Sequence, residues 1–514
     1  MKKLLSVVCT ALLLLGCLFA ENKVIQILSI NDFHGSLAEE AKEKGKNLGM
    51  AKLVSQMNIY KEEFPNTIVV SAGDNYQGSA MSNLTYGAPV SAMFKEMGVF
   101  VSAVGNHEFD WGIERTKKWQ RDGKFKFVAA NIVDKTTGKP VKWAVPYAIK
   151  KIDGVKVAFI GLTTPQTAYQ TSKERVQNYE FEDVKETAEK WAKELKSKGK
   201  ADIVIALTHV GSGQNRDSKD ISGEVIDTGL YKAEGIDAII SGHSHQTVCG
   251  VVDGMPIIQA YKYGRCVGRL IMTLDENNNL ISIEPKVETV YQTKSSLIED
   301  PRTKEKFEKF EADLSPIMDD KVGYASIDLS HDRSAEGVSV LGYLVTDIMR
   351  DNVDAQVGIA NSGGIRGPIA MGDITMGKMY EILPFDNTVV KMTLTGEQLK
   401  RVLNNGIKNE KIGWVEVCGV DLEVDMSRPF GDRIINMYLE DGTKIGMDDE
   451  ITVATIDFIF TGGDMYDFSG AKDAVDTFIP LRDVIVNTFK TMGPINFDFV
   501  QPIIYLDGNS QLAS

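Results

Sequence analysis

Short polar turns, each directly after an apolar strand-like run, are the feature that most constrains this chain. Parallel strands end at one edge of a sheet, so such turns bring side chains from distant parts of a sequence together. Five of the six histidines in the 514-residue sequence fall in these turns. The turns are Asn31-Asp32-Phe33-His34-Gly35, Gly73-Asp74-Asn75, Gly105-Asn106-His107-Glu108-Phe109-Asp110, Thr208-His209 and Gly242-His243-Ser244-His245.

A single histidine or aspartate at a strand end is usually a cap or a turn former. Five such turns in one chain make that interpretation insufficient for the whole set. Carboxylate, amide and imidazole groups are the ligands that Zn, Mn, Fe or Co accept in proteins. The pattern therefore predicts a metal site assembled from separate strands of an α/β domain.

The turns supply enough donors for two ions. Asp32, His34, Asp74 and His245 could hold one ion, and Asp74, Asn106, His209 and His243 could hold the second, with Asp74 as the bridge. Two divalent ions (Zn, Mn, Co or similar) about 3.5 to 4 Å apart would clamp the attacking and leaving oxygens of a displacement at phosphorus. The sequence thus predicts two divalent metal ions as cofactors.

His107 follows the predicted ligand Asn106 directly and is expected to face the substrate instead of a metal. Asp110, three residues later, could accept a hydrogen bond from the Nδ1 atom of His107. A histidine held in this way can stabilise charge on a phosphoryl oxygen or protonate a leaving group. A purely structural turn histidine is the alternative for this position.

Length and composition predict a globular protein of two or three domains, because 514 residues exceed what one hydrophobic core usually holds. The apolar content of 43% and charged content of 25% are ordinary. A formal charge of −14 argues against polymeric nucleic acid as a partner. A small phosphate ester remains acceptable as a substrate if cations inside the site offset its charge.

Residues 1–20 are expected to be an export signal, since Lys2 and Lys3 precede a short apolar segment. Leu14-Leu15-Gly16-Cys17 resembles a lipoprotein box, which would lipidate Cys17 and anchor the protein to a membrane. Leu18-Phe19-Ala20 would instead suit an ordinary signal peptidase. We favour the lipoprotein route, and either route predicts a protein of the periplasm or the cell envelope.

The cysteines beyond the signal leave two interpretations open. Cys249 and Cys266 could form a disulfide in an oxidising compartment, or they could remain unpaired. No pair has CxxC spacing, so thiolate metal binding and dithiol redox chemistry are both disfavoured.

Hydrophobic periodicity divides the rest of the chain into two α/β units. Residues 21–295 are expected to form a layered domain with helices outside its sheets, including helices near 49–64, 90–97 and 181–198. Residues 296–322 are charged, contain Pro301 and Pro316, and are expected to form a linker helix.

Residues 323–514 are expected to form the second unit. Its predicted elements include a helix at 337–350, a strand at 355–360, a helix at 396–404 and a strand region near 415–424.

Taken together, the five turns resemble the ordered motifs of calcineurin-like dimetal phosphoesterases. The variant resembled is the bacterial periplasmic UDP-sugar hydrolase and 5′-nucleotidase family, related to animal ecto-5′-nucleotidase, and the resemblance covers nearly the whole mature chain. It implies a layered α/β/β/α metallophosphoesterase domain joined by a linker helix to a second α/β substrate-binding domain. It also implies a hydrolase of nucleoside 5′-phosphates, with nucleotide sugars as further substrates and a site between the domains.

Two other functions stay open beside this one. A 2′,3′-cyclic-nucleotide 2′-phosphodiesterase with 3′-nucleotidase activity would use a similar metal domain. A surface lipoprotein that only binds nucleotide or metal is a third interpretation, although such a protein would be expected to have lost ligands, and none is missing here.

The resemblance also assigns a nucleoside clamp to the second unit. Asn361 and Arg366 match an Asn-x-Gly-Gly-x-Arg turn, Phe385 matches a Pro-Phe motif, and Phe458 and Asp464 match a Phe-x5-Asp motif. Two aromatic rings can sandwich a base, a carboxylate can accept from ribose hydroxyls, and an arginine can fork onto phosphate oxygens. A phenylalanine taken alone is more often part of a core.

One departure from the family concerns the second unit. Family members often carry an additional arginine near the start of a helix, where this chain has Val338, Ser339 and Val340. Tyr343 stands where asparagine is frequent, and Arg333 is expected to be an ordinary surface arginine. The departure affects the expected base and ester specificity, and leaves the metal chemistry unchanged.

Overall fold

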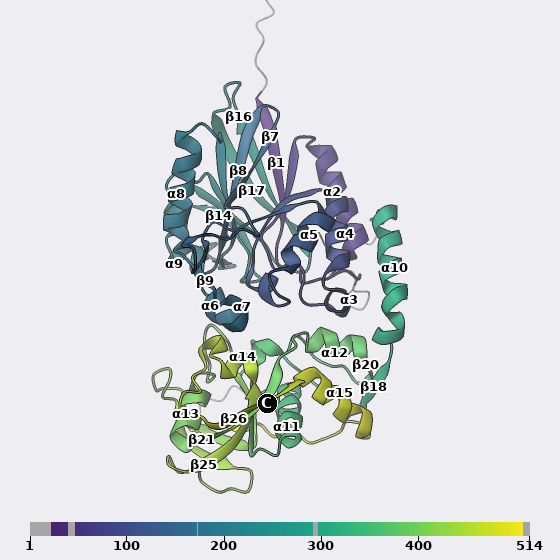
Figure 1. Ribbon diagram of the computed structural model, residues 1–514, viewed down its shortest axis with the longest axis vertical. Coiled ribbons are helices and arrows are strands. Elements are labelled where there is room, and N and C mark those ends of the chain that lie inside the picture. Colours follow the sequence, from purple (N-terminus) through teal and green to yellow (C-terminus); the bar gives the residue numbers. More distant parts are fainter. Residues whose placement is uncertain (1–21, 40–46, 172, 291–296, 507–514) are drawn as a thin grey trace, which may run out of the picture.

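The computed structural model describes residues 22–39, 47–171, 173–290 and 297–506. Two layered units lie one above the other, and one helix runs along the side of both (Figure 1). The export signal and the lipidation predicted at Cys17 lie outside the described residues. Among the described helices, none has the length and apolar character needed to cross a membrane.

Two six-stranded sheets form the first unit within the described residues. One contains, in order across the sheet, β17 (Leu280–Thr289), β16 (Cys266–Leu274), β1 (Lys23–Ile30), β2 (Thr67–Ser71), β3 (Val99–Ala103) and β4 (Lys126–Val128). The other contains β14 (Thr247–Val252), β15 (Met255–Ala260), β13 (Ala238–Ile240), β10 (Ile203–His209), β8 (Val155–Thr163) and β7 (Tyr147–Ile152). The central pairs β1–β2, β2–β3, β8–β10 and β10–β13 are parallel, so neighbouring strands end at the same edge of each sheet.

Helices cover the outer faces of both sheets (Figure 1). The first sheet is covered by α2 (Gly49–Glu63), α4 (Ala88–Met97) and α5 (Arg115–Gly123), and the second by α8 (Val184–Ser197). Between the sheets, Ile27 and Val70 of the first pack with Phe159 and Ile205 of the second in one buried cluster. The predicted α/β/β/α layering is confirmed.

Smaller elements connect these layers. They are α3 (Ala80–Leu84), β5 (Ile132–Asp134), β6 (Lys139–Pro140), α6 (Thr167–Gln170), α7 (Lys173–Val176), β9 (Tyr179–Phe181), β11 (Gly213–Gln214), β12 (Ile221–Ser222) and α9 (Glu224–Asp227).

A single helix, α10 (Pro301–Met318), joins the two units. Asp300 caps its first turn by accepting a hydrogen bond from the Thr303 amide, and Pro301 occupies the first position, where its missing N–H is harmless. Pro316 lies in the last turn, and the helix ends two residues later. Leu314 is buried against the core of the first unit, so α10 is packed along one side instead of being solvated all round.

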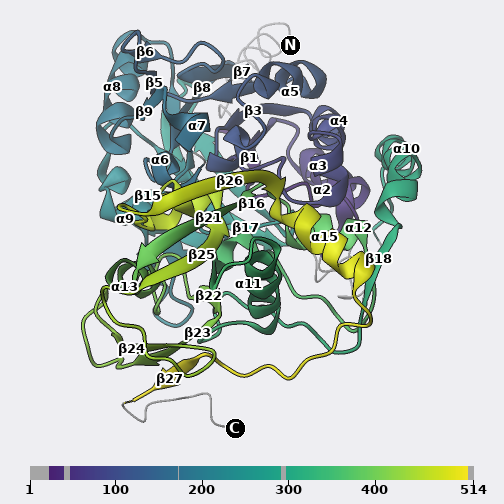
Figure 2. The ribbon, with the colours of Figure 1, turned by 60° about the horizontal axis from the view of Figure 1, so that its bottom comes forward.

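The second unit is built on a five-stranded sheet within the described residues, covered on one face by α11 and α15 (Figure 2). The strands are, across the sheet, β22 (Val415–Cys418), β19 (Val357–Asn361), β25 (Glu450–Ile456), β21 (Thr388–Thr395) and β26 (Lys472–Pro480). The helices are α11 (Val340–Asn352), α12 (Met376–Ile382), α13 (Gly396–Asn404), α14 (Asp457–Phe460) and α15 (Leu481–Thr491). Smaller sheets are formed by β18 (Lys321–Ala325) with β20 (Gly372–Thr375), and by β23 (Val420–Val424), β24 (Ile434–Leu439) and β27 (Ile503–Tyr505).

The strand region predicted near 415–424 consists of two strands in different sheets. Gly419 separates β22 from β23 with φ of 85°, in the left-handed region that favours glycine. A Cβ at this position would lie 2.0 Å from the Gln356 carbonyl oxygen, so a larger residue would not fit here.

The two interpretations of the cysteines are also resolved. Cys249, Cys266 and Cys418 are free thiols, so Cys249 and Cys266 do not form a disulfide.

Candidate dimetal site

The predicted metal-binding turns meet at the carboxyl ends of strands from both sheets of the first unit. Asp32 and His34 follow β1, Asp74 follows β2, Asn106 opens a short 3-10 helix after β3, His209 ends β10, and His243 and His245 follow β13. Backbone bonds join the turns, for example from His34 N to Asp74 O at 3.0 Å. The His243 amide also donates to the Asp32 carboxylate, which links a turn of one sheet to a turn of the other.

Two groups of ligand atoms result. In one group Asp32, His34 and His245 place their donor atoms within 4.8 Å of one another, and in the other Asp74, His209 and His243 do the same. Asp74 Oδ2 lies 3.0 Å from His209 Nε2 and 4.0 Å from His34 Nε2, so this carboxylate lies between the groups. Asn106 Oδ1 lies 3.1 Å from His243 Nδ1. The predicted ligand residues are therefore all brought together.

The imidazoles are oriented as metal ligands usually are. His209 Nδ1 contacts the Ala72 carbonyl oxygen at 2.7 Å, and His34 Nδ1 contacts the Gln77 carbonyl oxygen at 2.9 Å. A bond of this kind places the proton on Nδ1 and leaves the Nε2 lone pair for a metal. His209 Nε2 is buried and lies 3.0 Å from Asp74 Oδ2, without hydrogen-bond geometry to any atom of the described part of the chain. The donor set, with this buried nitrogen beside a carboxylate, fits a divalent ion.

Five of these residues occupy a backbone conformation that side chains seldom adopt. The φ angles of Asp32, His34, Asp74, His243 and His245 are 48°, 48°, 53°, 76° and 54°. Aspartate and histidine tolerate this region better than most residues, yet each instance still costs about 1 kcal/mol or more. Such strain gathers at functional sites, because the surrounding structure must hold it for a purpose other than stability.

Glycine at position 105 is required by the close approach of two turns. A Cβ on Gly105 would lie 2.1 Å from Asp74 Oδ1, so any side chain here would displace the carboxylate between the ligand groups. The glycine thus allows the third turn to lie directly against Asp74.

Burial and charge set the protonation of the site. Burial lowers the pKa of His34 and His245, and it lowers the pKa of His243 to about 3, so these rings are neutral and able to bind metal. Burial raises the pKa of Asp32. Burial alone would lower the pKa of His209, but Asp74 outweighs it and raises this pKa to about 10. The carboxylates therefore demand positive charge at this point, which a metal ion would supply.

His107 and Asp110 form the predicted pair. His107 Nδ1 lies 2.8 Å from Asp110 Oδ2, and the His107 amide donates to Asp74 Oδ1 at 2.9 Å. Burial opposes the charged form of His107, but Asp110 and Asp74 outweigh it and raise its pKa. The ring centroid is 5.3 Å from that of His34, and the residue belongs to neither ligand group.

Glu108, within the third turn, is a residue for which the sequence predicted no role. Its carboxylate accepts hydrogen bonds from the amides of Asp74, Asn75 and Gly105 at 2.9, 2.9 and 2.6 Å. Burial, followed by the charge of Asp74, raises the pKa of Glu108 to about 7. Glu108 thus joins the second and third turns and fixes the backbone of Asp74.

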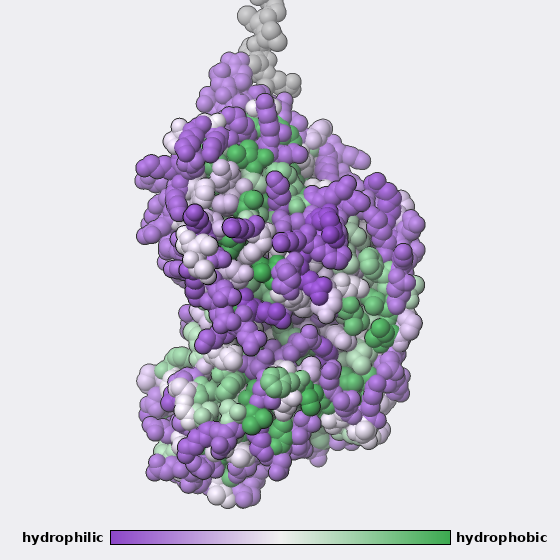
Figure 3. Space-filling view, in the orientation of Figure 1, coloured by the Kyte–Doolittle hydropathy of each residue, from purple (hydrophilic) through white to green (hydrophobic). Residues whose placement is uncertain are grey.

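The second unit reaches this site through Phe385. The rings of Phe385 and His107 stack with centroids 5.8 Å apart and planes at 27°. The Arg366 guanidinium lies 6.0 Å from the centre of the Phe385 ring. Asn83 of α3 donates to the Pro384 carbonyl oxygen at 3.1 Å, so one hydrogen bond also crosses between the units. Figure 3 shows an indentation in the outline of the molecule where the two units meet.

Of the other predicted clamp residues, Asn361 lines the same pocket as Phe385. Asn361 Nδ2 donates to Asp464 Oδ2 at 2.6 Å, and Asp464 has φ of 51°. Phe458 lies in α14, half-buried against the core of the second unit. Within the described residues no ring contact joins Phe458 to Phe385, so the two rings do not stack on each other.

Two cations near the site were missed from the sequence. Arg333 is exposed, as predicted for a surface arginine. It nevertheless lies near His245 of the first unit, whose pKa is lowered by burial and then by nearby cations that include Arg333. Lys262 places its ammonium 4.8 Å above the Tyr263 ring, and that ring lies 6.0 Å from His34. The loop at 261–265 follows β15 as the other turns follow their strands, which was the overlooked signal.

The positions that depart from the family serve the fold of the second unit. Ser339 caps α11 by accepting a hydrogen bond from the Gly342 amide. Tyr343 packs its ring against Phe497 and Phe499, with centroids 6.2 and 5.6 Å away.

Comparisons with known proteins agree with this architecture. Residues 25–247 match the family described as calcineurin-like phosphoesterase, and residues 320–471 match the 5′-nucleotidase C-terminal domain. A 5′-nucleotidase of Vibrio cholerae is 27% identical over 93% of this chain and 92% of its own length. Endonuclease YhcR of Bacillus subtilis is 31% identical over 86% of this chain, which spans only 37% of that longer relative.

A solved structure extends the comparison to the whole fold. The 5′-nucleotidase precursor from Thermus thermophilus superposes with a TM-score of 0.80 and 26% identity, covering 94% of this chain and 100% of that one. The predicted class of phosphoric ester hydrolase is confirmed at the level of the family. The chain belongs to the family in which a calcineurin-like phosphoesterase domain is joined to a 5′-nucleotidase C-terminal domain.

Proposed function

We propose that the chain is an exported, metal-dependent hydrolase that releases phosphate from nucleoside 5′-phosphates, with nucleotide sugars as further substrates. The observation that carries the proposal is the position of His107, which contacts His34 of one ligand group and Phe385 of the other unit. A metal pair binds a phosphoryl group, and an aromatic ring stacks on a base. A phosphorylated nucleoside is a ligand that satisfies both sides.

The metal ligands we propose are those named above. Asp32, His34, Asp74 and His245 would hold one divalent ion, and Asp74, Asn106, His209 and His243 the other. When bound, the two ions would neutralise charge on the phosphoryl group and lower the pKa of the attacking water.

His107 and Asp110 are the proposed catalytic pair. The Asp110 carboxylate holds Nδ1 of His107 and favours the protonated ring, in line with the raised pKa of His107. Its Nε2–H would then donate to a phosphoryl oxygen or to the leaving oxygen. His107 is well suited to this role because its amide is tied to Asp74, so its position follows that of the metal ligands.

The proposed clamp uses the residues of the second unit. Phe385 and Phe458 would stack on the base, and Asn361 and Asp464 would bind the ribose hydroxyls. Arg366 would bind phosphate oxygens. We add Arg333 and Lys262 to this set, because neither forms an ion pair within the described residues and both, like Arg366, lie close enough to His245 to affect its pKa.

Export and domain limits belong to the same proposal. Residues 1–20 would be removed or processed at Cys17, residues 21–295 would carry the metals, 296–322 would link, and 323–514 would bind substrate. If Cys17 is lipidated, Cys17→Ser should move the protein from the membrane fraction to the soluble fraction. Mass spectrometry of the mature N-terminus measures this directly, and an unmodified Glu21 terminus would contradict lipidation.

A phosphate-release screen tests the function. Purified protein with added Mn, Co or Zn is assayed on nucleoside 5′-mono-, di- and triphosphates, nucleotide sugars, and 2′,3′-cyclic and 3′-nucleotides. We expect the highest kcat/KM on a 5′-nucleotide. A preference for 2′,3′-cyclic nucleotides would establish the alternative activity, and binding without turnover of any substrate would favour a receptor.

A further inference from the structure

The loop that carries Phe385 is held from both units. Its backbone carbonyl oxygens accept hydrogen bonds as follows: Leu383 and Phe385 from Arg482 Nη1 at 3.0 and 3.3 Å, Pro384 from Asn83 Nδ2 at 3.1 Å, and Asn387 from the Leu481 amide at 2.8 Å. A loop with four of five consecutive carbonyls bound to other elements has little freedom to move.

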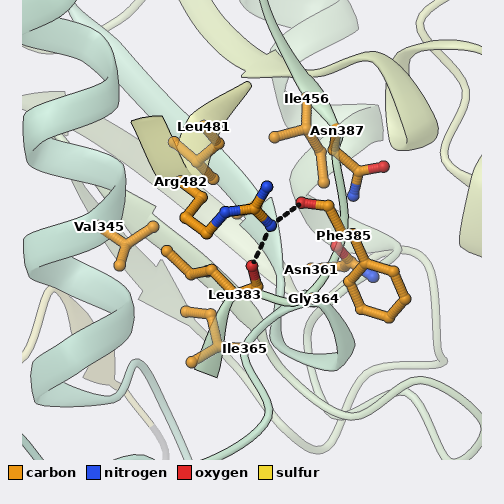
Figure 4. A pocket seen from close by; sticks show the side chains of 11 residues that line it. Val345, Asn361, Gly364, Ile365, Leu383, Phe385, Asn387, Ile456, Leu481 and Arg482 are labelled. Atoms are coloured by element: carbon orange, nitrogen blue, oxygen red, sulfur yellow. Dashed lines mark hydrogen bonds between the residues drawn. The ribbon is translucent and has the colours of Figure 1, made fainter. Parts of the chain in front are cut away.

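Arg482, the second residue of α15, makes two of these bonds and supports the loop in other ways. Figure 4 shows its guanidinium reaching between Leu383 and Phe385, in a pocket that Phe385 also lines. Arg482 Nη2 lies 2.5 Å from Asp386 Oδ1, and the guanidinium lies 4.0 Å from the centre of the Tyr380 ring.

The charge on Arg482 is costly for the fold alone. The residue is only 4% exposed, so its guanidinium has lost most of its hydration. The Asp386 side chain is 66% exposed, and an ion pair with so exposed a carboxylate contributes little. Arg482 Nε is buried without a hydrogen-bond partner in the described part of the chain. A buried apolar side chain of similar volume would avoid these costs.

The Arg482 guanidinium does, however, hold the backbone of the loop that carries Phe385. We propose that Arg482 is a positioning residue for nucleotide binding, which holds the loop Leu383–Asn387 so that Phe385 presents its ring to the base beside His107. The inference rests on the proposed function in one respect, namely that Phe385 stacks on a nucleobase. It adds a residue from α15 to the site, although that residue touches neither substrate nor metal.

Two substrates separate positioning from chemistry. A nucleoside 5′-monophosphate needs the base contact, whereas 4-nitrophenyl phosphate needs only the metal side. Arg482→Met should raise KM for the nucleotide by about tenfold, within the range set by loss of one stacking contact, and change kcat by less than about threefold. The kcat/KM for 4-nitrophenyl phosphate should stay within about twofold of wild type. Arg482→Lys, which keeps the charge but reaches fewer carbonyls, should be intermediate.

A double-variant cycle tests whether Arg482 acts through Phe385. Phe385→Ala removes the ring, so adding Arg482→Met to it should raise the nucleotide KM no further. Independent effects that multiply would show that Arg482 acts by another route and would overturn the inference.

Arg350 offers a matched control in the same unit. It also joins a backbone carbonyl, that of Gln356 at 3.1 Å, to carboxylates, those of Asp347 and Glu440 at 2.9 and 3.0 Å. Arg350→Met removes a comparable set of contacts away from the Phe385 loop, so the ratio of kcat/KM between the two substrates should stay at the wild-type value.

The outcomes distinguish the inference from the proposed function. Suppose that wild-type protein hydrolyses nucleotides, and that Arg482→Met and Arg482→Lys lower kcat/KM equally for both substrates or for neither. The inference then fails and the proposed function stands. If wild-type protein with metal hydrolyses 4-nitrophenyl phosphate but no nucleotide, the proposed function fails and the inference fails with it.

Discussion

The two sides of the site between the units are built in different ways. On the side of the first unit, the proposed metal ligands lie within a few positions of a buried strand, and five of them have left-handed backbone conformations. On the side of the second unit, Phe385 and Arg366 lie on loops, and the loop of Phe385 is held by Arg482 and Asn83 from elsewhere. The first side is fixed locally by strands, and the second by long-range contacts.

This difference separates two kinds of effect. Changes on the first side should abolish turnover, because they remove the groups that act on phosphorus. Changes on the second side should raise KM and leave the chemistry of small phosphate esters intact. Each variant below tests whether its effect is on turnover or on KM, as this division predicts.

The largest effect is expected from Asp74→Ala, because Asp74 Oδ2 lies within 4.0 Å of both His209 Nε2 and His34 Nε2. Turnover should fall on the order of 10⁴-fold, with loss of bound metal. Elemental analysis and phosphate release measure the two effects. Asp153, an exposed left-handed aspartate with φ of 47°, is the control, since Asp153→Ala should change neither. Full metal content in Asp74→Ala would contradict its place between the ions.

His107→Ala should come next, with turnover lower by about 10² to 10⁴ while metal content is retained. The reason is that His107 belongs to neither ligand group and pairs with Asp110 at 2.8 Å. Elemental analysis of the bound metal, together with the rate measurement, distinguishes a catalytic role from a metal-ligand role. If metal is lost together with activity, His107 must be reassigned as a ligand.

Phe458→Ala tests the second side directly. The nucleotide KM should rise about 5- to 100-fold, because one stacking contact is lost, while hydrolysis of 4-nitrophenyl phosphate is unchanged. Phe430, 52% exposed in the same unit, provides the control variant Phe430→Ala, which should leave both substrates unaffected. An equal loss on both substrates would mean that Phe458 supports the metal side and that the division between the units is wrong.

The smallest effect on activity is expected from Glu416→Gln, in the core of the second unit. Glu416 is 2% exposed, and burial raises its pKa from 4.5 to about 7. Because the folded pKa is the higher one, the stability that this group contributes is complete below about pH 4.5 and is lost as pH rises through about 7. His331 lies 3.5 Å away, and burial lowers its pKa to about 4, so it offers little positive charge near pH 7.

Glutamine does not titrate. The free energy of unfolding of Glu416→Gln, relative to that of wild type, should therefore rise by up to about 3 kcal/mol between pH 5 and pH 8. Thermal unfolding at the two pH values measures this gain, and activity at pH 7 should stay within about twofold. The same difference in unfolding temperature at both pH values would show that Glu416 is charged throughout.

The comparison also explains what the sequence could predict. A proposed ligand such as His209 is the last residue of its own strand, so a local pattern was enough to predict its position. The layering followed from alternating strands and helices in the same way. Residue types that are rare elsewhere in the chain, above all histidine, made the pattern visible.

The second side could not be predicted to the same extent. Arg333, Lys262 and Arg482 are ordinary cations in their local sequence, and their roles depend on which distant segment approaches them. The change of sheet within the strand region near 415–424 was not predicted, because a single glycine among apolar residues gives only a weak signal of it.

We predict that two divalent ions, held by the turns of the first unit, are needed to release phosphate from a nucleotide. Dialysis of the purified protein against a chelator, followed by titration with Mn, Co or Zn, tests it most directly. Phosphate release from a 5′-nucleotide should be absent without metal and should rise until two ions are bound per chain. Full activity in metal-free protein, or two bound ions without any phosphate release, would contradict the account.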